Sequence, residues 1–212
     1  MSAPSFAFPQ PLAERYRPRA IADFIGLDRP KRVLANFARN PRSAAFLFQG
    51  PSGTGKTTMA LALCEAIGGE LIHIPSQHCT VGELEESLRM TQYVPMAGKR
   101  FWFVLVDEAD QMTDKAQLAL LSKLDSTGRI DGCVFVFTCN SIDRLEARFL
   151  SRCLVIEFSS YGMASEIAAY LERVWHAEGG NGNAPDFARL AKECRNNVRD
   201  CLGRLEVELL AL

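Results

Sequence analysis

Five short segments of the chain are apolar or alternate apolar with polar residues, a pattern typical of β-strands. They are residues 45–49, 71–74, 101–106, 134–138 and 154–158. Helix-like segments lie between them, at residues 57–67, 81–90, 115–124 and 143–149. Strands that alternate with helices predict a mostly parallel sheet whose two faces are covered by helices. We therefore expect an α/β fold with a five-stranded parallel sheet.

Beyond residue 158 the strand pattern stops and only helical periodicity remains. Three apolar stripes follow at helical spacing, and a glycine-rich break at residues 179–182 separates the first stripe from the second. The stripes contain Ile167, Tyr170, Leu171, Val174 and Trp175, then Phe187, Leu190, Ala191 and Cys194, then Val198, Cys201, Leu202, Leu205 and Leu209. This change of pattern predicts two domains, an α/β domain over residues 1–159 and a small helical domain over residues 160–212.

The composition is that of an ordinary soluble globular protein, with 212 residues of which 48% are hydrophobic and 23% charged. A formal net charge of -1 excludes the basic field common in dedicated nucleic-acid binders, so contact with nucleic acid would need a local patch. No apolar run approaches the roughly 18 residues of a membrane-spanning helix, so no membrane partner is expected. Seven cysteines without a CxxC pair, and no signal-peptide pattern, favour free thiols and a cytoplasmic location.

A glycine-rich motif follows the first strand, where the pattern G-x-x-x-x-G-K-[ST] predicts a phosphate-binding loop. Its candidate nucleotide-binding residues after Gly50 are Pro51, Ser52, Gly53, Thr54, Gly55, Lys56, Thr57 and Thr58. Glycines leave room for backbone N–H groups to surround phosphates, and the helix that begins there directs its N-terminus at the anion. Lys56 can reach the β- and γ-phosphates, and the Thr57 hydroxyl can bind Mg²⁺. The motif predicts a protein that binds a nucleoside triphosphate.

Two carboxylates follow directly on the third strand, at the edge of an α/β sheet where ligands bind. Asp107 is the expected partner of Thr57 in a Mg²⁺ site, and Glu108 is expected to polarise the attacking water. The alternative is that these acidic residues only cap the next helix. Asn140, after the fourth strand, can reach the γ-phosphate or its water, although an asparagine there is often a simple turn residue.

Together these elements resemble the AAA+ ATPases, and among them the small subunits of the sliding-clamp loaders of archaea, eukaryotes and T4-like phages. The resemblance spans nearly the whole chain. Its further motifs are Glu14-Arg15-Tyr16-Arg17-Pro18, Asp23-Phe24-Ile25-Gly26, Asp107-Glu108-Ala109-Asp110, Ser151-Arg152-Cys153 and Asn197-Val198-Arg199-Asp200. It implies that ATP and Mg²⁺ are the ligands and that Tyr16, Arg17 and Ile25 lie near the adenine. Packing roles for these three residues are an equally good interpretation.

The resemblance also implies roles for polar residues outside the phosphate-binding loop. Asn140 falls at the sensor 1 position, and Arg199 lies where the lid carries its sensor 2 arginine. Arg152 matches the arginine finger, which implies a ring or arc in which Arg152 of one chain reaches ATP bound to the next. The implied partners are copies of this chain or related AAA+ subunits, a sliding clamp and primed DNA, in DNA replication.

Three departures from the clamp-loader pattern leave other functions open. Glu85 and Glu86 occupy a helix that in clamp loaders carries a basic residue facing DNA, and acid repels phosphate. Leu121 stands where the family carries an arginine, and the chain ends at Leu212 without the helical collar that joins clamp-loader rings. The collar would then be on another chain, or the assembly differs. The alternatives are an AAA+ remodeller of a protein partner without DNA, and a nucleotide-gated scaffold that hardly hydrolyses ATP.

Two other clusters have both a functional and a structural interpretation. Basic residues outnumber acidic ones between residues 15 and 42, which is typical of a solvated face and also of a phosphate-backbone patch. His73, His78 and Cys79 surround the second strand and suggest a metal site. The alternation of His73 with isoleucines favours a position on a sheet face instead.

Overall fold

The computed structural model describes residues 10–75, 80–95, 98–125, 131–181 and 184–211. The chain divides into two compact units. The α/β unit comprises Pro18–Ser159, and the helical unit combines residues 10–17 with residues 160–211. The predicted domains placed residues 10–17 with the α/β domain, whereas their contacts are with the helical unit.

A five-stranded sheet forms the centre of the α/β unit. Its strands are β1 (Ala44–Gln49), β2 (Gly69–Ile74), β3 (Phe101–Val106), β4 (Cys133–Cys139) and β5 (Leu154–Glu157). All pairs are parallel, in the order β2-β3-β4-β1-β5. The expected α/β fold with a five-stranded parallel sheet is confirmed. Because parallel strands share one carboxyl edge, residues that follow β1, β3 and β4 come together there.

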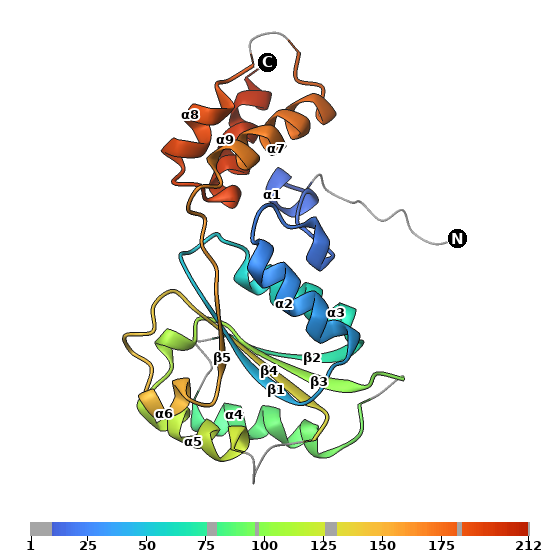
Figure 1. Cartoon of the computed structure of the whole chain (residues 1–212), viewed down its shortest axis with the longest axis vertical. Helices are drawn as coiled ribbons and strands as arrows, with labels where there is room; N and C mark the ends of the chain where they lie inside the picture. The colour runs from blue at the N-terminus through green and yellow to red at the C-terminus, as the bar shows by residue number, and fades with distance from the viewer. Residues whose placement is uncertain (1–9, 76–79, 96–97, 126–130, 182–183, 212) are drawn as a thin grey trace, which may run out of the picture. The chain divides into compact units, whose positions relative to one another are not determined.

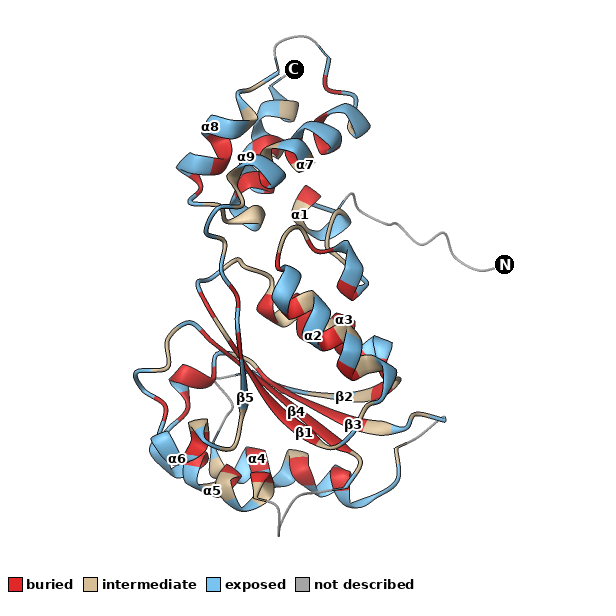
Figure 2. Ribbon diagram, viewed as in Figure 1, coloured by how far each residue is buried: buried red, intermediate tan, exposed pale blue. Residues whose placement is uncertain are grey.

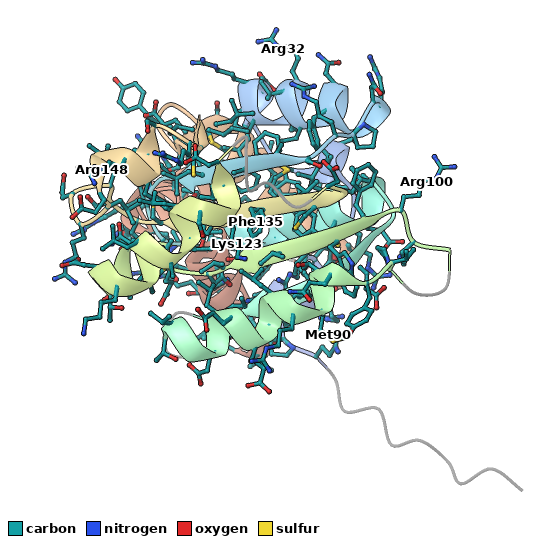
Figure 3. The ribbon with its side chains drawn as sticks, turned by 90° about the horizontal axis from the view of Figure 1, so that it is seen from below. Arg32, Met90, Arg100, Lys123, Phe135 and Arg148 are labelled. Carbon is teal, nitrogen blue, oxygen red and sulfur yellow. The ribbon has the colours of Figure 1, made fainter. Side chains whose placement is uncertain are left out.

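Helices cover both faces of this sheet, as Figure 1 shows. One face is covered by α2 (Asp28–Arg39) and α3 (Lys56–Ala66), and the other by α4 (Val81–Arg89), α5 (Asp114–Leu124) and α6 (Ala147–Leu150). The central strands are buried on both sides (Figure 2), which explains their almost uninterrupted apolar sequences. Phe135 of β4 packs with the residues of α4 and α5 (Figure 3). Short 3-10 helices are η1 (Ile21–Asp23), η3 (Met90–Gln92) and η4 (Ala109–Gln111).

The helix predicted over residues 143–149 is wrong in its first half, because α6 begins only at Ala147. The buried Gln117 side chain explains the difference. It donates to the carbonyl oxygen of Arg144 and accepts from the backbone N–H of Glu146. A side chain of α5 thus satisfies two backbone groups that a longer helix would have paired within itself.

Helix α2 was not among the predicted elements, although it packs firmly on the sheet. Leu34 and Phe37 lie in the core, and Phe37 meets Phe46 of β1 edge to face with ring centroids 4.8 Å apart. Its other positions are dominated by charge, including Arg29 and Arg32. Because charged residues dominate the outer face, the apolar stripe of α2 is narrow, and the apolar pattern of the sequence did not predict this helix.

The helical unit is built from α7 (Ala164–Ala177), α8 (Phe187–Glu193) and α9 (Val198–Leu210), with the short α1 (Leu12–Arg15). Trp175 is buried, with its ring centroid 6.3 Å from that of Phe187, so it is a core residue as expected. The hydroxyl of Tyr16 donates to Glu178, the residue that follows α7, at 2.7 Å, which ties residues 10–17 to the end of this helix. In the described part of the chain, no helix has the length and apolar character needed to cross a bilayer.

Candidate nucleotide-binding site

The predicted phosphate-binding loop joins the end of β1 to the start of α3. At Gly50 any Cβ atom would collide with the backbone carbonyl of Phe158, so only glycine fits there. Gly55 caps α3 with φ at 87°, a left-handed conformation that glycine adopts without strain. Helix α3 begins at Lys56, and its first backbone N–H groups have no partner inside the helix. This arrangement fits a phosphate anion.

Lys56 lies at the centre of the loop with only 8% of its surface exposed. Its Nζ donates to the carbonyl oxygens of Gly50 at 2.6 Å and Pro51 at 2.8 Å, and to Oδ1 of Asn140 at 3.1 Å. Burial lowers the pKa of Lys56, while nearby acidic groups, Asp107 among them, act in the opposite direction. The ammonium group is therefore held between the loop and the end of β4.

Asp107 lies at the end of β3 and receives hydrogen bonds from two other elements. Its Oδ1 accepts from the hydroxyls of Thr57 and Thr138, each at 2.7 Å, and its Oδ2 lies 3.3 Å from Nε2 of His73. Thr57 and Asp107 thus present two oxygen ligands side by side. Such a pair fits Mg²⁺, which commonly takes one or two protein ligands and completes its shell with phosphate oxygens and water.

Glu108 follows in a left-handed conformation, with φ 53° and ψ 50°, which is uncommon for a residue with a side chain. Its backbone N–H donates to the hydroxyl of Thr138 at 3.0 Å, and its side chain is exposed. Glu108 is also the cap of η4, so the capping interpretation and the functional one apply to the same residue. The structure brings Glu108 and Asn140 to the same edge of the sheet as Lys56.

Two residues of this edge were not predicted as site residues. Thr138 bonds to both carboxylate residues, and its only signal in the sequence is a polar residue near the end of an apolar strand. His73 contacts Asp107 and is not merely a residue on a sheet face. Among the described residues, no group of three or more His, Cys, Asp or Glu side chains could hold a metal ion. His78 and Cys79 lie outside the described residues.

The remaining loop residues have simpler surroundings. The Thr54 hydroxyl donates to the carbonyl oxygen of Pro51 at 2.8 Å, while Ser52 is exposed. Gly53 has φ at 77°, and Thr58 is buried in the first turn of α3. Within the loop, Gly53 supplies a left-handed backbone conformation and Thr54 a side-chain bond to the backbone.

Arg152 follows α6 and makes its hydrogen bonds within its own chain. Its guanidinium donates to the carbonyl oxygen of Arg148 at 2.8 Å and to Oδ2 of Asp125 at 3.0 Å, and 27% of its side chain is exposed. Asp125 directly follows α5. The nearby Arg148 is exposed (Figure 3).

The expected adenine-side residues are divided between the two units. Ile25 belongs to the α/β unit and is partly exposed. Its neighbour Phe24 lies against the phosphate-binding loop, because a Cβ atom added to Gly55 would be only 3.0 Å from the Phe24 ring. Tyr16 and Arg17 belong to the helical unit. So does Arg199, an exposed residue in the first turn of α9.

Some basic residues of the N-terminal region have partners within the fold. Arg15 forms an ion pair with Glu178 in the helical unit. Lys31 donates to the carbonyl oxygen of Phe24 at 3.0 Å, while Arg32 lies exposed on α2 (Figure 3). Arg15 and Lys31 therefore make contacts within the folded chain.

Comparisons with known proteins identify the family of this chain. The ATPase family associated with various cellular activities (AAA) matches residues 46–161. The replication factor C small subunit of Methanocella arvoryzae is 27% identical over 91% of this chain and 61% of its own length. Replication factor C small subunit 1 of Pyrobaculum arsenaticum is 33% identical over 69% of this chain and 46% of its own length. The chain thus spans about half the length of these curated relatives.

Solved structures share the fold. The RuvB Holliday junction branch migration motor of Thermotoga maritima superimposes with a TM-score of 0.73, at 17% identity, over 92% of this chain and 72% of its own. The family match covers more than half of the chain, including the phosphate-binding loop, Asp107, Glu108 and Asn140. The chain therefore belongs to the AAA family of ATPases and, within it, is similar to the small subunits of replication factor C.

Proposed function

We propose that this chain is a Mg²⁺-dependent ATPase that works as one subunit of an AAA+ oligomer, in the manner of a clamp-loader small subunit in DNA replication. The observation that carries the proposal is the convergence of polar groups at the carboxyl edge of the sheet. Lys56 lies 3.1 Å from Asn140, and Thr57 lies 2.7 Å from Asp107. The similarity to replication factor C small subunits supports the choice of process and of partners, namely related subunits, a sliding clamp and primed DNA.

Each residue has a defined task in this proposal. Lys56 and the backbone N–H groups of the loop bind the phosphates, while Thr57 and Asp107 hold Mg²⁺. When bound, the metal ion neutralises charge that develops on the phosphate oxygens. Glu108 orients the attacking water, and Asn140 contacts the γ-phosphate or this water.

Five further residues complete the proposed site. Arg152 acts in trans, on ATP bound to a neighbouring subunit, and Arg199 contributes from the lid. Tyr16 and Arg17 act on the adenine side, together with Ile25. These assignments rest on the positions of the family motifs in the sequence.

The proposal is tested by the Mg²⁺-dependent rate of ATP hydrolysis at high protein concentration, for the wild type and Glu108→Gln. A water-orienting carboxylate contributes roughly 10²- to 10⁴-fold, so kcat should fall by that range while ATP binding persists. Glu65→Gln, an exposed change on α3, is the matched control and should keep the wild-type rate. An unchanged rate in Glu108→Gln would remove Glu108 from the chemistry.

The DNA step is tested by adding primed DNA at moderate salt. Stimulation of several-fold that weakens as salt rises would support a clamp-loader role, because phosphate contacts release counterions. A rate that ignores DNA at low and moderate salt would contradict it.

A second candidate function is the remodelling of a protein partner without DNA. Glu85 and Glu86 are both exposed on α4, and their negative charge opposes a nucleic-acid backbone at this surface. A third candidate, a nucleotide-gated scaffold, is favoured by the ion pair that holds Arg152 on its own chain. A rate that responds to neither DNA nor protein concentration would support the scaffold.

A further inference from the structure

Thr138 lies between the two acidic residues of the candidate site and bonds to both. Its hydroxyl donates to Oδ1 of Asp107 at 2.7 Å and accepts from the backbone N–H of Glu108 at 3.0 Å. The residue is 2% exposed and belongs to β4, the strand beside β3. A hydroxyl has one proton to donate and lone pairs to accept with, so both bonds form at once.

The hydrogen bond to Glu108 is made at a residue whose backbone conformation is strained. Glu108 has φ at 53°, and a left-handed conformation at a residue with a side chain persists only where its surroundings impose it. The N–H group that Thr138 accepts from belongs to this same residue. The strand tip of β4 therefore restrains the direction in which the Glu108 side chain leaves the backbone.

The bond to Asp107 restrains the neighbouring carboxylate. Thr57 bonds to the same oxygen from α3, and His73 lies beside the other oxygen from β2. Of these three partners, Thr138 also bonds to Glu108, so it links the orientation of one carboxylate to that of the other.

From this geometry we infer that Thr138 is a positioning residue of the ATPase site, which holds Glu108 in its left-handed conformation and Asp107 in its ligating orientation. The inference rests on the proposed function and adds a residue to it. The consequence for catalysis is specific. Loss of the hydroxyl should misplace the water-orienting group without removing any group that binds the nucleotide.

Two substitutions separate the role of the Thr138 hydroxyl from that of the rest of the side chain. Thr138→Val keeps the shape and removes the hydroxyl, whereas Thr138→Ser keeps the hydroxyl. Thr91→Val is the matched control, because Thr91 is also buried in the α/β unit and its hydroxyl donates to the carbonyl oxygen of Leu88, away from the site. Thr138→Ala replaces the valine variant if that variant melts below the assay temperature.

Kinetics provide the first measurement. Misplacement of a catalytic group by about 1 Å can cost on the order of 10²-fold, so we expect kcat of Thr138→Val to fall roughly 10- to 100-fold. The KM for ATP should change much less than kcat, because the phosphate-binding groups are untouched and Thr57 still bonds to Asp107. Thr138→Ser and Thr91→Val should keep a kcat close to that of the wild type. A valine variant with the wild-type kcat, or a serine variant as slow as the valine variant, would overturn the inference.

Hydrogen–deuterium exchange of the nucleotide-free protein provides a measurement that is independent of activity. The Glu108 amide should exchange faster in Thr138→Val than in the wild type or Thr138→Ser, because its acceptor is gone. Equal exchange in all three would contradict the positioning role even if the protein hydrolyses ATP. If the wild type hydrolyses no ATP but the amide responds as expected, the proposed function fails and the hydrogen bond stands.

Discussion

At the scale of single residues, Lys56 shows how a buried charge can be prepared for a ligand. Its ammonium group already has three acceptors, the carbonyl oxygens of Gly50 and Pro51 and the amide oxygen of Asn140. These bonds offset the cost of burying the charge. They also hold the group in the loop, where a phosphate would bind.

Lys56→Ala should weaken ATP binding by roughly 10- to 100-fold, because a hydrogen bond to a charged group contributes about 1.5 to 3 kcal/mol. The measurement is a titration with a fluorescent ATP analogue, alongside a melting curve to show that the variant is folded. Lys115→Ala is the control, since Lys115 is exposed on α5. If Lys56→Ala binds ATP as tightly as the control does, Lys56 does not contact the nucleotide.

At the scale of elements, two sets of side-chain contacts join parts of the chain that no local pattern connects. Gln117 of α5 bonds to the backbone on both sides of Leu145. The Tyr16–Glu178 hydrogen bond joins residues 10–17 to the C-terminal end of α7 inside the helical unit. Each contact decides where a short segment ends or packs.

Gln117→Leu should destabilise the α/β unit by about 1 to 3 kcal/mol, because it leaves the carbonyl oxygen of Arg144 and the N–H of Glu146 without their partner. Denaturation by urea measures the change in free energy of unfolding. Gln92→Leu, at an exposed position, should change it by less than about 0.5 kcal/mol. Equal stability of both variants would mean that water replaces Gln117 without cost.

The Tyr16–Glu178 contact should make the stability of the helical unit depend on pH. The hydrogen bond from Tyr16 lowers the pKa of Glu178, so this bond stabilises the fold above the ordinary pKa of glutamate and is lost as the pH falls through the lowered value. Burial, aided by Glu178, raises the pKa of Tyr16 to about 12, so its contribution is complete below pH 10 and is lost toward pH 12.

Tyr16→Phe should lower the free energy of unfolding near pH 7 by about 1 to 3 kcal/mol and flatten its dependence on pH at both ends. Fluorescence of the buried Trp175 reports on this unit in Trp102→Phe protein. Tyr161→Phe, at an exposed position, serves as the control. A wild-type pH profile in Tyr16→Phe would show that the contact does not stabilise the fold.

At the scale of the whole molecule, the proposed activity needs more than one copy of the chain. Arg152 is bonded to Asp125 and Arg148 on its own chain, so it must exchange at least the Asp125 partner to reach a neighbour's nucleotide. Both side chains of this ion pair are partly exposed, at 27% for Arg152 and 47% for Asp125, so water screens it. Giving up this partner therefore costs little, on the order of 1 kcal/mol.

Arg152→Ala should lower ATP turnover by about 10³- to 10⁵-fold, the usual value of an arginine finger. Mixing it with Glu108→Gln protein should restore part of the rate. In a randomly mixed ring about a quarter of the interfaces would pair an intact site with an intact finger. Mixing Arg152→Ala with an Arg152→Ala/Glu108→Gln double variant is the control and should restore nothing. No recovery in the first mixture would argue against action in trans.

The sequence by itself determined those features that are written in consecutive residues. The phosphate-binding loop and the Asp107–Glu108 pair could be located because each motif is contiguous and borders an apolar strand. The parallel sheet followed from the alternation of strands and helices. Local spacing controls both features, so no knowledge of distant contacts was needed.

Only the tertiary structure decided which distant residues complete the site. Thr138 is 31 residues from Asp107, and His73 is 34 residues from it. Polar residues near strand ends are common, and only the pairing of β3 with β2 and β4 brings these two onto Asp107. The late start of α6 likewise depends on Gln117, 29 residues before Glu146. Hydrogen bonds between remote segments form only once the fold has brought them together, so no local pattern encodes them.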